Sequence, residues 1–439
     1  MRKKLRLPFT NMKPKGWQNL ALAAALTFYI IQIGFFAING TICEDYAFDY
    51  CAYWSAGKLM NQAGFTDAYD LDLLAQFQKD TYNIEDKLLE FFKPIEVPYL
   101  PIFLIPFKVV ASINLPASFL LWTLVNFVGL ILYLKFFIEK VSEKPLHLRH
   151  FTMLLLSLPV FISFQEGQVN VWLLICAGEF IRAILSNKHI KAGLWLGGWL
   201  LKPQILLLIL PFLLLKRSIK SLLGFSLSTL VILLVSFLLI KWEGLIKLFN
   251  IIFESAGGGA TSNPGAMMNW RMLGWHLTSI TSDAIGWIII IIGSILTIFA
   301  TFYFFRKGFA SGSSIKIIEI LGVFAATMLV TWHAHVHMSI VLIPPMVYLL
   351  EKNRFNKSLF SSWVFFPIFF HLIGYIVISV IFFGNVKIEI LSLSWFIRGF
   401  PSFLLNLILL IWTIKHTDKE ENETQKNNTW SNDTSKNKI

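Results

Sequence analysis

Apolar runs recur along the chain from position 17 to position 415. A run of about 20 apolar residues is long enough to cross a bilayer as a helix. Hydropathy and loop charge together predict twelve spans, at residues 17–38, 116–138, 151–164, 169–185, 190–202, 204–215, 219–240, 284–305, 315–332, 337–350, 359–384 and 395–415. The pattern therefore predicts an all-α, polytopic bundle of transmembrane helices.

Composition excludes a soluble protein. Of the 439 residues, 56% are hydrophobic and 15% are charged, against roughly a quarter charged in an average soluble domain. The net charge of +12 does not indicate a nucleic-acid partner, because it is unevenly distributed. Residues 41–96 hold eleven acidic and four basic residues, and the basic excess lies in short loops between apolar runs.

Those basic loops set the predicted topology. They lie at 140–149, 188–191, 216–220, 306–316 and 352–357, and Lys and Arg are enriched in cytoplasmic loops. All five basic loops fall on the cytoplasmic side only if residues 99–113 do not cross the membrane. That segment is short and contains Pro101 and Pro106, which favours an interfacial or re-entrant helix. We expect a multi-pass protein of the cell membrane with both termini inside.

The chain is predicted to form a single membrane domain over residues 1–415. Two outer loops, 39–98 and 241–283, are long enough to hold structure, and the first is expected to contain short amphipathic helices at 55–61 and 71–81. Residues 416–439 are polar and predict a disordered cytoplasmic tail. Cys43 and Cys51 share the first loop; unpaired thiols are the favoured interpretation, and a disulfide in an oxidising compartment is the alternative.

Unusual polar residues collect at the predicted outer face. They are Asp49, Tyr53, Gln165, Glu166, Gln168, Asn170, Lys202, Gln204, Arg271, His276, His333, His335 and His337. Ionisable groups near hydrocarbon are costly and usually face a cavity or a partner. Five separate segments that deliver such groups to one side predict one outward-facing site.

Each group also has a structural interpretation. Asp49 could be one more solvated acid of an acidic loop. Lys202 could extend its ammonium to the membrane interface. Gln168 and Asn170 could join helices through amide hydrogen bonds. These interpretations stay open on the sequence alone.

The three histidines at 333, 335 and 337 suggest a metal site at first sight. On a helix, however, His333 and His337 share a face while His335 points nearly opposite, and zinc needs three or four convergent ligands. Hydrogen bonding to a phosphate or a sugar is the favoured role, with metal binding and structural roles as alternatives. We therefore expect no metal.

Several short motifs, taken in order, resemble those of a known group of membrane enzymes. They are Asp49-Tyr50-Cys51-Ala52-Tyr53, Tyr99-Leu100-Pro101, Gly167-Gln168-Val169-Asn170, Ala192-Gly193-Leu194 and Lys202-Pro203-Gln204. Over residues 17–350 the chain resembles the multi-spanning GT-C glycosyltransferases, most closely the polyprenol-phosphate-mannose-dependent mannosyltransferases of glycosyltransferase family 87. The resemblance implies a GT-C fold and transfer of a hexose, mannose first, from a polyprenyl-phosphate sugar to a glycolipid or glycan acceptor.

The resemblance also implies roles for individual residues. An acid of the first outer loop acts as the general base in the family, and Asp49 is the position that matches, with Asp45 and Glu44 as close competitors. Because they lie at the predicted outer face, the residues expected to bind the donor phosphate and sugar are Tyr53, Gln168, Asn170, Lys202, Gln204, Arg271, His333 and His337. A phosphate is a good leaving group, so neither a metal nor another cofactor is expected, and single-step inversion is the simpler outcome.

Two other functions compete with this interpretation. A transporter or flippase of lipid-linked sugars would use similar groups, but it needs them near the bilayer midplane and it needs two access states. A polymerase resembling O-antigen ligases would also face outward, but its large loop is expected late in the chain. Here the acidic loop comes first, which favours the glycosyltransferase.

Overall fold

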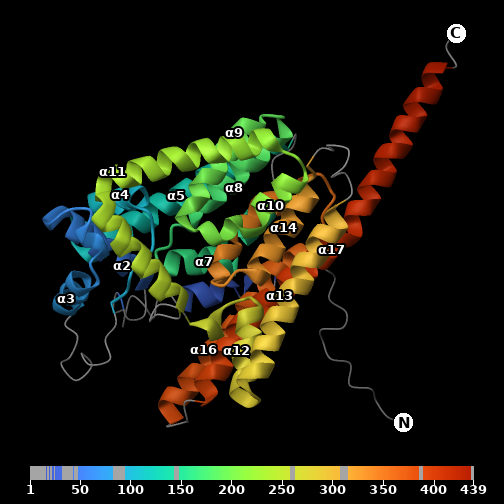
Figure 1. The fold of residues 1–439 in the computed structure, drawn as a ribbon. Helices are drawn as coiled ribbons and strands as arrows, with labels where there is room; N and C mark the ends of the chain where they lie inside the picture. The colour runs from blue at the N-terminus through green and yellow to red at the C-terminus, as the bar shows by residue number, and fades with distance from the viewer. Residues whose placement is uncertain are drawn as a thin grey trace, which may run out of the picture.

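The computed structural model describes residues 16, 19, 22–23, 25–31, 43, 48–82, 94–142, 148–257, 263–306, 315–384 and 389–436. Within these ranges every element is a helix, apart from one isolated β-bridge between Met267 and His335. The all-α prediction is therefore confirmed. Helices α2, α3 and α4 gather at one end of the molecule beside the long α11, and α12, α13, α16 and α17 pack together at the other (Figure 1).

The helices follow one another along the chain with few long connections. The α-helices are α2 Phe48–Gln62, α3 Leu71–Tyr82, α4 Pro101–Val110, α5 Leu115–Val141, α6 Leu148–Leu155, α7 Leu158–Gln165, α8 Asn170–Leu185, α9 His189–Gly197, α10 Leu206–Leu215, α11 Ile219–Gly257, α12 Trp270–Ile280, α13 Asp283–Phe305, α14 Ile317–Val330, α15 Ile343–Glu351, α16 Lys357–Gly384 and α17 Glu389–Lys436. Short 3₁₀ turns are η2 Asp67–Tyr69, η4 Gly198–Leu201, η5 Pro203–Ile205, η6 Pro264–Ala266 and η7 Val336–Leu342.

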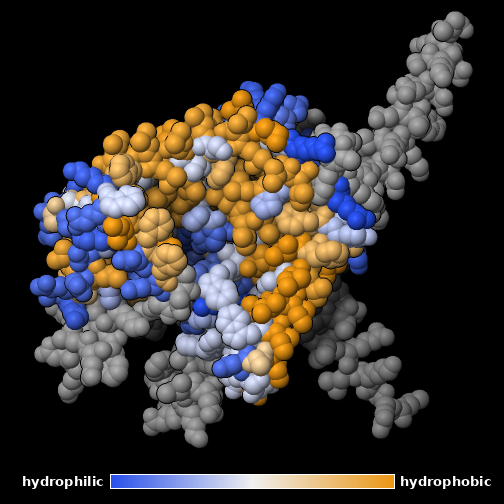
Figure 2. Space-filling model, viewed as in Figure 1, coloured by the Kyte–Doolittle hydropathy of each residue, from blue (hydrophilic) through white to orange (hydrophobic). Residues whose placement is uncertain are grey.

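Five described helices are long and apolar enough to cross a membrane. They are α5, residues 219–254 of α11, α13, the first part of α16 and residues 393–417 of α17. Much of their surface is exposed and apolar, and Figure 2 shows α11 and α13 as continuous hydrophobic bands. These helices make the chain a multi-pass membrane protein. The predicted count of twelve spans stays a prediction, since most of the first, 17–38, lies outside the described residues.

Several predicted spans are built from shorter pieces. The span at 151–164 is divided into α6 and α7, the span at 190–202 into α9 and η4, and the span at 337–350 into η7 and α15. Broken helices are tolerated at membrane depth only where the freed backbone is buried in protein or lines a cavity. Here α14 is enclosed on nearly all sides, and a buried ion pair of 2.8 Å between Lys216 and Glu319 joins it to the end of α10.

The segment predicted as re-entrant forms α4. At ten residues and 1.5 Å per residue it is about half the length that a crossing requires. It packs on α2, where Gly57 lies directly against the backbone carbonyl of Phe107. A side chain at position 57 would force the two helices apart. The prediction that this segment does not cross agrees with its length.

The first loop contains the two expected helices, but α2 differs from expectation. The sequence predicts short helices lying on the membrane surface, whereas α2 is mostly buried between α4 and neighbouring elements. Its first turn is held by a disulfide between Cys43 and Cys51, whose Cα atoms are 5.8 Å apart. The favoured interpretation of unpaired thiols is therefore wrong, because a turn at Cys43 folds back onto α2.

Two predicted boundaries also change. The outer loop expected at 241–283 begins inside α11, which continues past a kink at Lys241, and the loop also holds α12. The disordered tail was expected from residue 416, but α17 continues as a helix to Lys436. Adding a residue to an existing helix costs much less than nucleating a new one, so polar residues can extend a stable apolar helix.

Candidate active site

The candidate site lies where several helices are interrupted. Between α7 and α8 the chain turns at Gly167, whose φ of +64° lies in the left-handed region that favours glycine. A side chain at position 167 would also collide with Tyr50 of α2. The turn is fixed from two sides, because Trp122 donates to the Gly167 carbonyl at 2.9 Å and the Tyr50 amide donates to the Glu166 carbonyl at 3.0 Å. This docking places the start of α2 beside Gln168.

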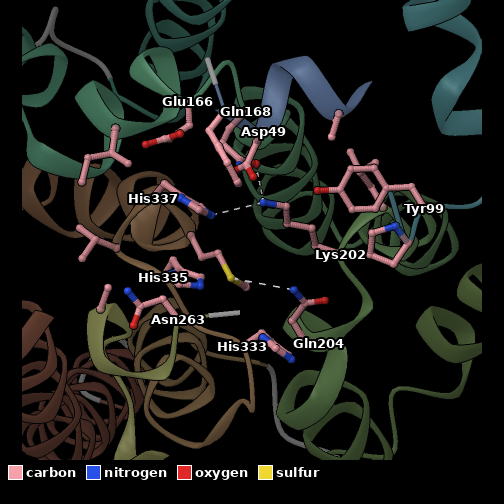
Figure 3. A pocket seen from close by; sticks show the side chains of 18 of the residues that line it. Asp49, Tyr99, Glu166, Gln168, Lys202, Gln204, Asn263, His333, His335 and His337 are labelled. Atoms are coloured by element: carbon pink, nitrogen blue, oxygen red, sulfur yellow. Dashed lines mark hydrogen bonds between the residues drawn. The ribbon is translucent and has the colours of Figure 1, made fainter. Parts of the chain in front are cut away.

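Asp49 lies in the first turn of α2, where the helix dipole favours a carboxylate. The side-chain amide of Gln168 donates to Asp49 Oδ2, and the ammonium of Lys202 donates to Gln168 Oε1 at 2.6 Å. Figure 3 shows these three side chains converging from different segments of the chain. A carboxylate, an amide and an ammonium are thus linked in one chain of hydrogen bonds.

Two tyrosines determine the orientation of the Gln168 amide. Tyr53 donates to Gln168 Oε1 at 3.2 Å, and the Tyr53 and Tyr99 hydroxyls are 3.0 Å apart. Since Tyr53 and Lys202 both donate to the same oxygen, the NH₂ group of Gln168 must face Asp49. Tyr99 is itself positioned by Tyr69, which donates to the Tyr99 carbonyl at 2.6 Å. The amide thus presents its donors to the carboxylate.

Lys202 occupies the break between η4 and η5 and is buried. Its Nζ atom lies 3.4 Å from Nε2 of His337, and the rings of His335 and His337 are stacked at 5.7 Å. Burying an ammonium is costly unless it is paired, and here Asp49, Gln168 and His337 surround it.

The histidines are arranged differently from the helical prediction. Residues 331–335 are not helical; His335 pairs with Met267 in the isolated bridge, and η7 begins at Val336. His333, His335 and His337 therefore all line the same cavity, whereas helical spacing had turned His335 away. Among the residues that the structure describes, no group of three His, Cys, Asp or Glu side chains is arranged to hold a metal ion.

A cavity of about 630 Å³ unites these groups. Of the residues predicted from the sequence, it is lined by Asp49, Tyr53, Gln168, Lys202, Gln204, His333 and His337. Gln204 also contacts the sulfur of Met338 at 4.0 Å. Figure 3 shows Asp49 and Glu166 on one side of Lys202, and Gln204 and His333 on the other. The predicted convergence of distant segments is therefore present in the fold.

Two of the residues assigned to donor binding do not line the cavity. Asn170 is buried at the start of α8 and donates to Ser163 Oγ at 3.2 Å, which matches the helix-joining role. Arg271 stacks its guanidinium on the ring of Trp332 at 4.1 Å and donates to the Trp332 carbonyl at 3.3 Å. Trp332 itself lines the cavity, so Arg271 lies just behind the cavity wall.

The cavity also contains polar residues to which the sequence assigned no role in catalysis or donor binding. Glu166 and Tyr99 line it, and so do His371 of α16 and Arg398 of α17. Arg398 donates to Nδ1 of His371 at 3.2 Å, and its side chain lies across α16 at Gly374. His371 and Arg398 fall inside predicted spans, where an ionisable residue is itself a signal of function. That signal could have identified both.

Burial shapes the ionisation of the carboxyl groups. Burial raises the pKa of Asp49, while Lys202 and the Gln168 hydrogen bond act to lower it. Burial and the neighbouring Asp49 raise the pKa of Glu166 to about 8, against a smaller opposing effect of Arg398. Burial, reinforced by nearby cations, lowers the pKa of His335 to about 3. At neutral pH Glu166 and His335 are therefore mainly neutral hydrogen-bonding groups.

The fold and cavity define a class: a polytopic helical membrane protein with a carboxylate, an ammonium and neutral donors around one polar chamber. Such a set can accept a proton from a hydroxyl group and bind an anion. The sequence profile of glycosyltransferase family 87 matches residues 98–331, which is more than half of the chain. The chain belongs to glycosyltransferase family 87 and is a membrane glycosyltransferase.

Comparison with curated proteins and with solved structures gave no match. The matched region includes α4 to α14 and contains Tyr99, Gln168, Lys202 and Gln204. Asp49, the three histidines and Arg398 lie outside it. The region that matches the family therefore supplies one part of the cavity wall, and residues outside that region supply the rest.

Proposed function

We propose that this glycosyltransferase moves a hexose, mannose as the first candidate, from a polyprenyl-phosphate sugar to a lipid-linked or glycan acceptor. The observation that carries the proposal is the hydrogen-bonded sequence of Asp49, Gln168 and Lys202 inside one cavity. This arrangement places a base, Asp49, and a cation, Lys202, on either side of the Gln168 side chain. Membership of a glycosyltransferase family favours transfer over transport of the same lipid.

In the proposed reaction an acceptor hydroxyl attacks the anomeric carbon of the donor sugar. The new carbon–oxygen bond forms as the bond to the phosphate oxygen breaks, and the electron pair of that bond leaves with the lipid phosphate. Asp49 accepts the hydroxyl proton as general base. Gln168 holds the carboxylate in place through its amide, and Tyr53 and Lys202 hold Gln168 in turn.

Lys202 and His337 are the proposed contacts of the leaving phosphate. Negative charge grows on the phosphate as the glycosidic bond breaks, and a fixed cation in a water-poor site stabilises that growth. Gln204 and His333 line the same side of the cavity and can bind sugar hydroxyls. The phosphate is already a good leaving group, so the proposal needs no metal or other cofactor.

Inversion at the anomeric carbon remains the proposed outcome although the cavity contains a second carboxyl group. A retaining mechanism needs an ionised carboxylate as nucleophile. Glu166 has a raised pKa and is mainly protonated at neutral pH, which makes it a poor nucleophile and a suitable donor to a sugar hydroxyl. We therefore assign Asp49 as the single base and Glu166 to substrate binding.

We expect a bell-shaped dependence of kcat/KM on pH. The rate falls at low pH as Asp49 takes up a proton, and this limb lies higher than for an exposed aspartate because burial raises its pKa. The rate falls again above about pH 8 as Glu166 loses its proton and repels the donor phosphate, and as Lys202, whose pKa burial lowers to about 8, loses its charge. Glu166→Gln stays neutral and should make the alkaline fall in rate less steep. An alkaline limb that is equally steep in Glu166→Gln would assign that limb to Lys202 alone.

The active site is proposed to face the outside of the cell membrane. The basic loops after α8, α10 and α15 lie at the far ends of helices whose other ends reach the cavity, and basic loops are retained in the cytoplasm. The disulfide between Cys43 and Cys51 lies beside Asp49, and disulfides persist mainly in oxidising compartments. Both observations support an outward-facing cavity.

This orientation predicts a labelling pattern. In intact cells, a membrane-impermeant thiol reagent should label Gln62→Cys at the end of α2 but not Arg354→Cys after α15; both positions are exposed. Permeabilised cells should show label at both, with Cys176→Ser as background because Cys176 is the free cysteine of the described region. Labelling of position 354 from outside would place the cavity on the other face.

Sugar transfer is distinguished from lipid transport by a covalent product. Purified protein in lipid vesicles, supplied with polyprenyl-phosphate mannose and a glycolipid acceptor, should release polyprenyl phosphate in equal amount to the glycosylated product. Movement of intact donor across the vesicle bilayer without release of polyprenyl phosphate would instead support a flippase.

A further inference from the structure

The mouth of the cavity is apolar although its interior is polar. Phe48 of α2, Ile252 of α11 and Trp332 before η7 all line the cavity, and their exposed fractions are 38%, 39% and 37%. Figure 2 shows a hydrophilic hollow with hydrophobic surface above it and to its right. A molecule that fills both parts must combine a polar head with an apolar chain.

A kink in α11 brings one wall of this mouth into place. At Lys241 the backbone has φ 52° and ψ −161°, a region that is almost restricted to glycine. Such a conformation persists only where the surroundings hold it. Here Thr66 donates to the Ile240 carbonyl at 3.3 Å, and Lys247 pairs with Asp70 at 2.9 Å. These contacts with the first loop thus hold the second half of α11 beside the cavity.

An apolar path continues outward from the mouth on both sides. On α11, Phe249 and Phe253 lie within one turn of Ile252, and both are largely exposed. On the other side, the exposed Trp287 of α13 stacks on Trp332, with ring centroids 5.9 Å apart. The path leads from the polar chamber to the membrane-facing surface of α11 and α13.

We propose that the gap between Ile252 and Trp332 is the portal through which the hydrocarbon chain of the lipid-phosphate donor leaves the cavity. The phosphate and sugar occupy the polar chamber, and the chain lies against Phe249, Phe253 and Trp287. This inference rests on the proposed function and adds the binding site of the lipid to it.

The donor, rather than the acceptor, is the assigned occupant because of where the phosphate contacts lie. Lys202 is adjacent in sequence to Pro203, which is exposed and lines the cavity. A phosphate bound at Lys202 therefore has its ester oxygen near this edge. Asp49 and Glu166, where the acceptor hydroxyl is placed, lie on the other side of Lys202 (Figure 3).

Exposed apolar residues are normal on any membrane helix. A test of the portal must therefore distinguish its residues from ordinary lipid-facing residues. We expect the native enzyme to have a lower KM for long-chain polyprenyl-phosphate mannose than for a short-chain analogue, because the chain buries apolar surface along the path. Each buried methylene changes affinity by roughly fourfold. Ile252→Gln should raise KM for the long-chain donor about tenfold and leave KM for the short-chain donor nearly unchanged.

The control is Leu124→Gln on α5, which is also exposed and apolar but does not line the cavity. It should leave both KM values unchanged. Equal KM values for long and short donors in the native enzyme would overturn the portal while leaving the glycosyltransferase proposal intact. An equal rise for both donors in Ile252→Gln would also overturn it.

A binding measurement separates the portal from the chemistry. Long-chain polyprenyl phosphate with a photoreactive group on its hydrocarbon chain, added to the native protein, should label residues 249–253 and Trp332, and excess unlabelled polyprenyl phosphate should compete. This result is expected whether or not mannose is the transferred sugar. Label spread evenly over α5, α11 and α13, or label that does not compete, would contradict the portal.

Discussion

Asp49→Asn should lower turnover about 10²–10⁴-fold, which is the usual contribution of a general base. Asparagine keeps the size of the side chain and can still accept a hydrogen bond from Gln168, but it cannot take up the proton of the acceptor hydroxyl. Donor affinity should therefore stay close to that of the native enzyme, so the loss appears in kcat. The measurement is single-turnover transfer from polyprenyl-phosphate mannose, with donor binding measured separately.

The matched control is Asp72→Asn in α3, an exposed carboxylate of the same acidic loop that does not line the cavity. It should retain nearly full activity. Asp45 and Glu44, the rival bases, lie outside the described residues, so Asp45→Asn and Glu44→Gln are needed as well. If Asp45→Asn abolishes transfer and Asp49→Asn does not, the base has been assigned to the wrong residue.

Lys202→Met should have the second largest effect. Methionine keeps much of the apolar stem but removes the cation next to the proposed phosphate, and the loss of one such group typically costs about 10²–10³-fold. We expect kcat/KM for the donor to fall by about that factor. Lys202→Arg should restore activity only in part, because a planar guanidinium does not reproduce the contacts of an ammonium with Gln168 and His337.

The control for this variant is Lys191→Met, an exposed lysine of α9. A thermal unfolding midpoint near that of the native protein would show that Lys202→Met remains folded. If Lys202→Met then keeps native donor affinity and turnover, the lysine serves only to place its ammonium at the membrane interface, which was the structural interpretation of its position.

Much of the site could be predicted because polar residues are rare in this chain and lie at helix ends. Asp49, Gln168, Lys202 and His337 each interrupt or flank an apolar run, and the charge of the intervening loops assigns them to one face. The structure brings all four to one cavity. Hydropathy was sufficient here because each segment contributes its polar group near the same end of the bundle.

Other features depend on contacts that hydropathy does not encode. His371 and Arg398 lie within long apolar segments, so they were assigned to lipid-crossing helices and not to the cavity. The length of an apolar run does not distinguish a crossing helix from two short helices that meet at a break, as at α6 and α7. The cavity position of His335 follows from its pairing with Met267, a contact 68 residues distant in sequence.

The pairing of Cys43 with Cys51 was missed for a similar reason. Their separation of eight residues allows many geometries, and only the turn that leads into α2 brings them together. The kink at Lys241 is equally invisible in the sequence, because lysine has no preference for that backbone conformation. Its cause lies in the first loop, through Thr66 and Asp70.

The central claim, that this membrane glycosyltransferase takes its sugar from a lipid phosphate, is tested most directly by the choice of donor. Purified protein in lipid vesicles is given radiolabelled mannose, glucose or arabinose on polyprenyl phosphate, and in parallel the corresponding nucleotide sugars, together with a glycolipid extract as acceptor. The account predicts labelled product from polyprenyl-phosphate mannose and none from any nucleotide sugar. Product formed from a nucleotide sugar, with none from the three lipid-linked donors, would contradict it.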